Sequence, residues 1–165
     1  MGCEENKIAK EKETCGTNKS GIPKADTNKT SIKLVEESAA TGKVKKIYND
    51  IKKTLGIDFV PNMYKALGNN PSYLEITWKK IQDIMGKSSK LDNKTKDIIA
   101  LTVSIMSGCE YCINVYNDAV KHNGLDDKAL LEVYNVIDVY SGLNRLNIGT
   151  QVKQDEKPWH GCGAK

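Results

Sequence analysis

The sequence lacks any long apolar run, which argues against a membrane-spanning protein. No stretch approaches the ~18 uninterrupted apolar residues of a membrane helix. Residues 1–12 lack the apolar segment of a secretory signal. Met1-Gly2-Cys3 is similar to a dual-acylation signal, but Asn6 stands where myristoylation prefers Ser or Thr. We therefore expect a cytoplasmic protein with no membrane partner.

Aromatic residues are also scarce, at 6%, and no basic run is interleaved with them. The formal net charge of +4 is spread over many Lys and Glu residues. This composition favours a solvated surface of mixed charge, so we expect no nucleic-acid partner. Convincing strand alternation is missing as well. At 165 residues, with 39% hydrophobic residues, the chain is long enough for one packed core with tails.

Cysteines number five, and an odd count in a reducing compartment argues against a framework of structural disulfides. Only two of them, Cys109 and Cys112, lie in a strongly patterned region. A structural zinc site is an alternative for this pair, but zinc needs four ligands. The other candidate ligands all lie in the terminal segments, namely Cys3, Cys15, His160 and Cys162. We therefore expect no bound metal and no bound cofactor.

Helical periodicity dominates the rest of the chain and predicts an all-α bundle of about six helices. Residues 1–33 are expected to be a mobile polar tail, residues 34–152 a helical domain, and residues 153–165 a C-terminal tail. The fourth helix is apolar over much of its circumference, so we expect it to be central and buried. The predicted helices span 41–55, 61–67, 71–86, 93–107, 109–122 and 127–149.

The segment Cys109-Glu110-Tyr111-Cys112 follows a helix break at Ser107-Gly108 and begins the fifth helix. Unpaired N–H groups and the helix dipole at such a position favour a thiolate over a thiol. Tyr116 lies one turn beyond Cys112 on the same face. If the preceding helix packs antiparallel, it brings Asp97 beside this row, where burial would raise the pKa of the carboxyl. The missing βαβ context argues against a thioredoxin fold.

The run from Lys96 to Ser104, followed by Gly108-Cys109-Glu110-Tyr111-Cys112, resembles the alkylhydroperoxidase D and carboxymuconolactone decarboxylase family. The resemblance covers roughly residues 33–150 and includes Phe59-Val60-Pro61-Asn62 and Tyr140-Ser141-Gly142-Leu143. It implies an all-helical homo-oligomer, a trimer or hexamer. It also implies a redox-active Cys109–Cys112 disulfide that reduces peroxides or exchanges electrons with a lipoyl- or thioredoxin-type donor.

By position in this family, Asp97 stands where Glu is usual, and Tyr116 stands where His is usual. The acid is kept, but a phenol titrates near 10 and cannot shuttle protons near pH 7 as an imidazole does. We therefore expect an antioxidant-type peroxidase or disulfide reductase whose peroxidase activity is weak or absent while disulfide exchange survives. Two alternatives stay open: a non-catalytic helical binding or scaffold protein of the same fold, and an enzyme similar to a lactone decarboxylase.

Overall fold

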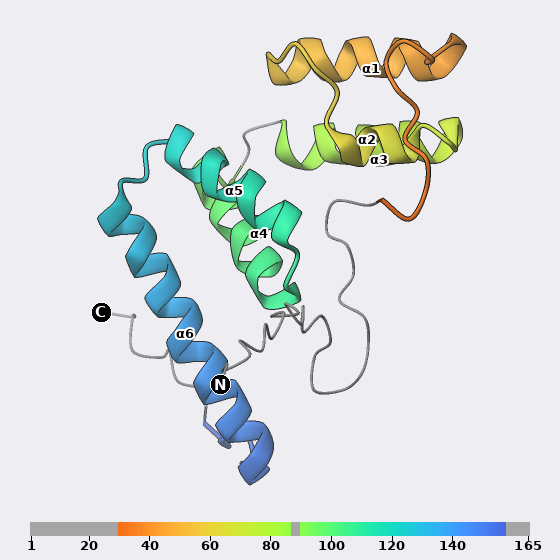
Figure 1. The fold of residues 1–165 in the computed structure, drawn as a ribbon. Helices are drawn as coiled ribbons and strands as arrows, with labels where there is room; N and C mark the ends of the chain where they lie inside the picture. The colour runs from red at the N-terminus through yellow and green to blue at the C-terminus, as the bar shows by residue number, and fades with distance from the viewer. Residues whose placement is uncertain (1–29, 87–89, 158–165) are drawn as a thin grey trace, which may run out of the picture. The chain divides into compact units, whose positions relative to one another are not determined.

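A computed structural model describes residues 30–86 and 90–157, and every regular element in them is a helix. This confirms the predicted all-α fold and, within these residues, the predicted number of helices (Figure 1). None of the helices described is long and apolar enough to cross a membrane. The helices are α1 (Gly42–Leu55), α2 (Asn62–Leu67), α3 (Pro71–Met85), α4 (Asn93–Ser107), α5 (Glu110–His122) and α6 (Asp127–Thr150).

Capping residues set the ends of these helices close to where the sequence predicts them. Three N-cap side chains each accept a hydrogen bond from the backbone N–H three residues further on. They are Asp92 at 2.7 Å, Asp126 at 2.8 Å and Asn70 at 3.1 Å. Gly56 and Gly108 end α1 and α4 in the left-handed conformation, with φ of 67° and 66°, which glycine adopts without steric cost. The boundaries therefore follow from local chemistry.

The chain falls into two compact units that divide between Lys79 and Lys80. In the first unit, the apolar faces of α1, α2 and α3 form the core. Tyr48, Ile51 and Leu74 are among its most completely buried side chains. The rings of Tyr64 and Trp78 meet edge to face, with centroids 5.5 Å apart, an arrangement that aromatic pairs prefer. Burial of these large side chains accounts for most of the driving force for folding this unit.

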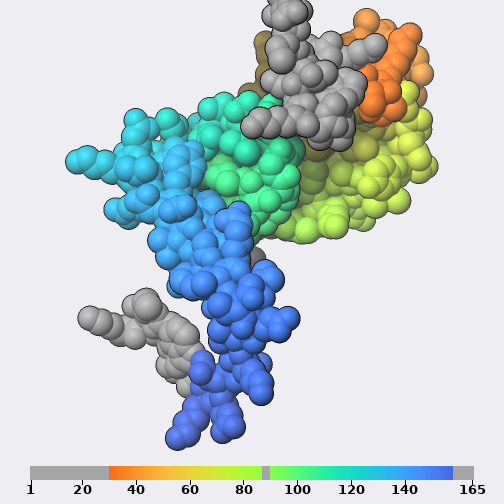
Figure 2. Space-filling view, turned by 60° about the horizontal axis from the view of Figure 1, so that its bottom comes forward, coloured from red at the N-terminus to blue at the C-terminus, as the bar shows by residue number. Residues whose placement is uncertain are grey.

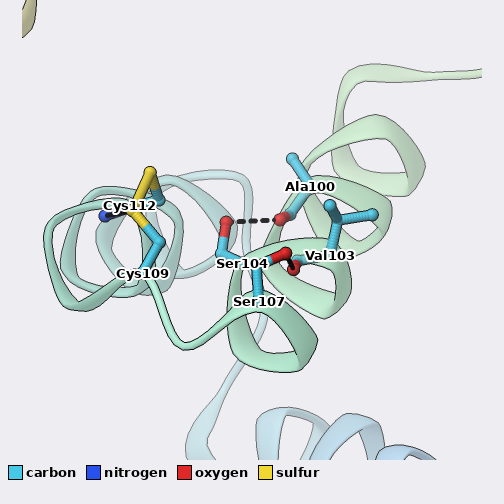
Figure 3. Close-up of a disulfide and its surroundings, with 6 residues drawn as sticks. All are labelled: Ala100, Val103, Ser104, Ser107, Cys109 and Cys112. Atoms are coloured by element: carbon cyan, nitrogen blue, oxygen red, sulfur yellow. Dashed lines mark hydrogen bonds between the residues drawn. A yellow bond between two sulfur atoms is a disulfide. The ribbon is translucent and has the colours of Figure 1, made fainter.

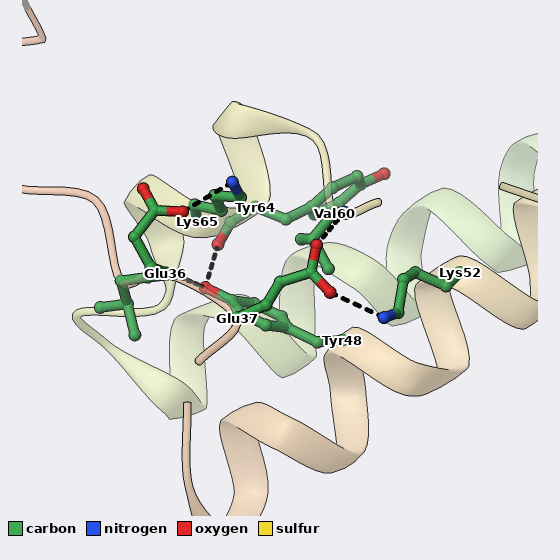
Figure 4. A network of polar contacts seen from close by, with 8 residues as sticks. Glu36, Glu37, Tyr48, Lys52, Val60, Tyr64 and Lys65 are labelled. Atoms are coloured by element: carbon green, nitrogen blue, oxygen red, sulfur yellow. Dashed lines mark hydrogen bonds and ion pairs between the residues drawn. The ribbon is translucent and has the colours of Figure 1, made fainter. Parts of the chain in front are cut away.

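A polar network centred on Glu37 joins the segment before α1 to the rest of this unit (Figure 4). The Glu37 carboxylate accepts the Val60 backbone N–H at 2.8 Å and the Lys52 ammonium at 2.7 Å. These bonds, first that of Lys52 and then that of Val60, hold the pKa of Glu37 below its usual value. Tyr48 adds a hydrogen bond from its hydroxyl to the Val35 carbonyl at 3.0 Å.

In the second unit, α4 and α5 form a helical hairpin, and α6 packs against it. The buried core is small and consists of Leu101, Val120, Leu125 and Leu130. The expectation that α4 is buried on most sides is wrong for the described chain. Only Asp97, Leu101 and Ser104 of α4 are buried, whereas Val103 is 59% exposed. A single neighbouring hairpin partner covers only one stripe of a helix, so the rest of its apolar surface faces outward.

Helix α6 continues well past the hairpin, as the two views agree (Figure 1, Figure 2). Every residue from Gly142 to Thr150 is exposed. The last turns of α6 therefore present both apolar and polar side chains to the surroundings. Along its packed half, α6 and α4 border a largely apolar groove of about 630 Å³, lined among others by Ile98, Met106 and Ile137.

Candidate functional site

Cys109 and Cys112 lie at the start of α5 and are joined as a disulfide (Figure 3). Their Cα atoms are 5.3 Å apart, within the usual range for a disulfide. Cys109 is the N-cap residue, and its sulfur accepts the backbone N–H of Cys112 at 3.3 Å. Both residues are half-buried. In the reduced state, the free N–H groups and dipole at this helix end favour a thiolate.

The end of α4 fixes the backbone that carries the pair. The Cys109 N–H donates to the Ser104 carbonyl at 3.0 Å, and Gly108 supplies the left-handed turn between the helices. The hydroxyls of Ser104 and Ser107 donate back to the carbonyls of Ala100 and Val103 (Figure 3). Hydroxyls engaged in this way brace the end of α4 and do not bond to sulfur. The pair thus sits on rigid backbone at a helix junction.

Asp97 is buried in the first half of α4, with 8% of its surface exposed. Burial raises the pKa of its carboxyl, the direction that we expect from the sequence, because a low-polarity environment penalises the charged form. A hydrogen bond from the Asn123 amide, 2.7 Å from the carboxylate oxygen, opposes this effect. Asp97 is thus a buried carboxyl with a raised pKa and one hydrogen-bond donor from outside its own helix.

Tyr116 lies in the middle of α5 and is half-buried against the cluster around Leu101 and Val120. The pKa of its phenol is raised, first by burial and then by the negative charge of Asp97. The charge of Asp97 therefore acts on Tyr116 from the neighbouring helix of the hairpin. Tyr116 therefore remains a protonated hydrogen-bond donor at neutral pH.

Asp97 lies nearer to the Tyr116 end of the predicted row than to the sulfur atoms. It bonds to Asn123, which follows the last residue of α5. At about 1.5 Å per residue, Asn123 lies about 16 Å along the helix axis from Cys112, too far for its bonded carboxyl to touch the thiols. Tyr116 falls between, about 6 Å beyond Cys112. The order along α5 is therefore dithiol, phenol, carboxyl.

Asn123 is the member of this arrangement that sequence reasoning missed. We predict its position only as the end of a helix, because Asn123-Gly124 is a helix-stop signal. Its side chain bonds to Asp97, which lies 26 residues away in the sequence, and local sequence patterns do not predict contacts at that separation. The available signal would have been the predicted burial of Asp97 itself, since a buried carboxylate needs a hydrogen-bond donor.

In residues 30–86 and 90–157, no three His, Cys, Asp or Glu side chains lie close enough together to hold a metal ion. The thiols and imidazole considered as extra zinc ligands, Cys3, Cys15, His160 and Cys162, lie outside the described residues. The described part of the site therefore consists of two sulfurs, a phenol, a carboxyl and an amide.

Comparison with known proteins places this arrangement in context. The model of the carboxymuconolactone decarboxylase family matches residues 71–152, which include both cysteines, Asp97 and Tyr116. The structure is similar to that of the alkylhydroperoxidase AhpD core from Rhodospirillum rubrum, with a TM-score of 0.74 and 29% sequence identity. This similarity covers 77% of the present chain and 95% of that one.

A curated relative is the (R)-2-haloacid dehalogenase of Pseudomonas putida, which is 28% identical over 107 residues. The match covers 65% of the present chain but only 35% of the dehalogenase. The chain thus spans about a third of the length of that relative.

Proposed function

Because this chain belongs to the alkylhydroperoxidase D-like and carboxymuconolactone decarboxylase family, we propose that it is a thiol-based oxidoreductase. Its working group is the Cys109–Cys112 pair. The observation that carries the proposal is the position of this pair, half-buried at the N-terminus of α5 and close enough to close a disulfide. The substrates are a hydroperoxide or a disulfide, and the electron donor is a dithiol carrier of the lipoyl or thioredoxin type.

The catalytic cycle balances two electrons and two protons. One cysteine, as thiolate, attacks a peroxide oxygen, the O–O bond breaks, and the product alcohol takes up a proton. The second cysteine attacks the resulting sulfenic acid and releases water, which closes the Cys109–Cys112 disulfide. A dithiol then attacks this disulfide through a mixed disulfide and returns both thiols, while the carrier becomes oxidised.

Tyr116 and Asp97 supply the proton path in this proposal. Tyr116 lies one helical turn beyond Cys112, so its hydroxyl can exchange a proton with a thiol directly or through one water. As the Tyr116 oxygen accepts the thiol proton, the phenol releases its hydroxyl proton toward the Asp97 carboxylate. Because the phenol is a poor base near neutral pH, we expect disulfide exchange to be faster than peroxide reduction.

The experiment measures turnover of the reduced protein with a hydroperoxide and, separately, reduction of its disulfide by dihydrolipoamide. We expect Cys112→Ser to abolish both reactions, and Cys109→Ser to do the same. Ser107→Ala, at the same junction, is the matched control and should keep both activities. A pair that neither closes a reversible disulfide nor turns over either substrate contradicts the proposal and favours a non-catalytic scaffold. Halide release from an (R)-2-haloacid that is indifferent to Cys112→Ser would favour a different enzyme.

We also propose that the protein self-associates through α4 and α6. On α6, Val136, Val139, Leu143 and Leu146 recur at three- and four-residue spacing and are exposed by 44–59%. From Gly142 to Thr150 the one charged residue is Arg145, and depletion of charge is typical of an interface core. An exposed helical end of this length is marginally stable alone, so a second copy is the occupant that this surface fits.

Light scattering on purified protein tests the assembly. We expect a homo-oligomer, a trimer or hexamer, and we expect the double change Leu143→Glu and Leu146→Glu to reduce it to monomers. Lys153→Glu, just beyond α6, introduces a similar charge change and should leave the assembly intact. A wild-type protein that stays monomeric at high micromolar concentration rules out this part of the proposal.

A further inference from the structure

Asn123 connects the end of α5 to the buried acid of α4. Its side-chain amide donates to the Asp97 carboxylate at 2.7 Å, across 26 residues of sequence. Its backbone N–H separately donates to the Ala119 carbonyl at 3.0 Å and completes the helix end. The side chain is therefore not needed to cap the helix. The side-chain amide is instead bonded to Asp97.

Within the described residues, the Asn123 amide acts on Asp97 without an ion pair beside it. Among the described residues, no Lys or Arg forms a salt bridge with the Asp97 carboxyl. The Asn123 amide, just past the end of α5, is the side chain that lowers the pKa of the carboxyl, and no charged side chain in the described part of α6 shifts it. The carboxylate in turn raises the pKa of the Tyr116 phenol on α5. A buried carboxylate with a single strong donor depends on it both for its ionised form and for its orientation.

We propose that Asn123 is a positioning residue, which holds the Asp97 carboxylate in place and in its ionised form so that Asp97 can receive the proton from the site. This inference rests on the proposed function, because it assigns a role in the same proton path. Asn123 touches neither substrate nor sulfur in this scheme and acts only through Asp97.

The direction of the effect follows from the opposing influences on Asp97. Burial raises the pKa of the carboxyl, and the Asn123 amide lowers it by bonding to the charged form. Loss of the amide removes the opposing influence, so the pKa rises further. At a given pH, a larger share of molecules then carries a protonated Asp97 that cannot accept a proton. The acid limb of the rate profile should move to higher pH.

The test compares Asn123→Ala with wild type in two ways. Carbon-13 NMR follows the titration of the Asp97 carboxyl directly and needs no activity. A pH series follows the rate at which dihydrolipoamide reduces the disulfide. Hydrogen bonds to charged groups change equilibria by about tenfold or more. We therefore expect the Asp97 titration to move up by about one pH unit, and the acid limb of the rate profile to move up with it, with full recovery of the rate at higher pH.

Further variants separate positioning from a merely structural role. Asn123→Gln keeps the amide and should restore most of the lost rate. Asn123→Ser keeps a polar helix end but is too short to reach Asp97, so it should behave like Asn123→Ala and serves if that variant does not fold. Asn117→Ala is the matched control, because the Asn117 side chain instead accepts the Tyr134 hydroxyl at 2.6 Å.

The outcomes distinguish this inference from the proposed function. A rate that falls evenly at all pH values, with an unmoved Asp97 titration, overturns the positioning role. If the wild-type protein has no thiol activity, the proposed function fails, and so does the catalytic meaning of Asn123. The NMR titration still decides in that case whether the amide controls the carboxyl. If the wild-type protein is active but the Asp97 titration of Asn123→Ala is unshifted, the positioning role is refuted and the proposed function stands.

Discussion

Replacing Tyr116 with histidine should increase the peroxidase rate of this protein. The change puts an imidazole where the phenol now lies, one turn from Cys112 and within the electrostatic influence of Asp97. A phenol with a pKa of about 10 is ionised in roughly one molecule in a thousand at pH 7. Burial and the charge of Asp97 raise the pKa of Tyr116 further. As a base, the present residue is almost unavailable.

An imidazole of ordinary pKa, about 6.5, is neutral in roughly three molecules of four at pH 7 and can accept a proton. A positioned acid–base group contributes about 10²–10⁴-fold to a rate, so we expect Tyr116→His to gain about 100-fold with a hydroperoxide. The smaller ring packs less well against Leu101 and Val120, at a cost of about 1–2 kcal/mol in unfolding free energy. That cost is compatible with a folded domain.

The assay mixes reduced protein with excess cumene hydroperoxide and quenches the reaction to count free thiols over time. Asp97→Asn in the Tyr116→His background should remove most of the gain, because no carboxylate then orients the imidazole or stabilises the imidazolium that forms when it accepts a proton. Tyr116→Phe controls for loss of the hydroxyl without a new base. A folded Tyr116→His variant whose rate stays within threefold of wild type refutes the reasoning.

Three further changes test the physical account of stability. Asp97→Asn should stabilise the fold at pH 7 but not at pH 3. Because the pKa of Asp97 is raised in the folded protein, the folded protein loses stability relative to the unfolded chain as the pH rises and the buried carboxyl ionises. Glu37→Gln should destabilise at pH 7 but not at pH 3, because the lowered pKa of Glu37 makes its contribution disappear as pH falls. Urea denaturation at each pH measures the free energy of unfolding of both variants and of the wild type. Gly68→Ala should cost about 1–3 kcal/mol, because a Cβ would clash with the Tyr48 hydroxyl. Gly142→Ala, with open space around it, should not destabilise, and equal melting temperatures for the two alanine variants would contradict the clash.

Much of the fold was predictable because its helix boundaries are set by local chemistry. Asn70 before Pro71, Asp92 before α4 and Asp126 before α6 are N-cap signals, and the structure places a capping bond at each. The end of α6 was less predictable. Its pattern predicts a stop at Gly149, but the helix continues to Thr150 and ends at Gln151 in the left-handed conformation. An exposed helix end is set by small energies that sequence pattern does not resolve.

The surroundings of α4 could not be read from its own periodicity. An apolar circumference predicts burial, yet Ile99, Val103 and Met106 are 50–59% exposed in the single chain. The hydrophobic pattern of a helix indicates that its apolar surface is buried, but not whether the same chain or another copy buries it. The same limit applies to Asp97. Its identity as a buried acid was predictable, whereas its donor Asn123 depends on the register between two antiparallel helices.

The pH dependence of Tyr116→His relative to wild type isolates the proton-transfer step. Both proteins carry the same two thiols, so dividing one rate profile by the other removes the titration that they share. The phenol does not change its charge below pH 9, because burial and Asp97 raise its pKa above the ordinary value. A change in the ratio between pH 5 and pH 8 therefore comes from the imidazole and from its effect on the titration of the neighbouring Asp97. We expect the ratio to rise through the histidine titration and then level off. A ratio that is flat across this range would mean that residue 116 transfers no proton in the rate-limiting step.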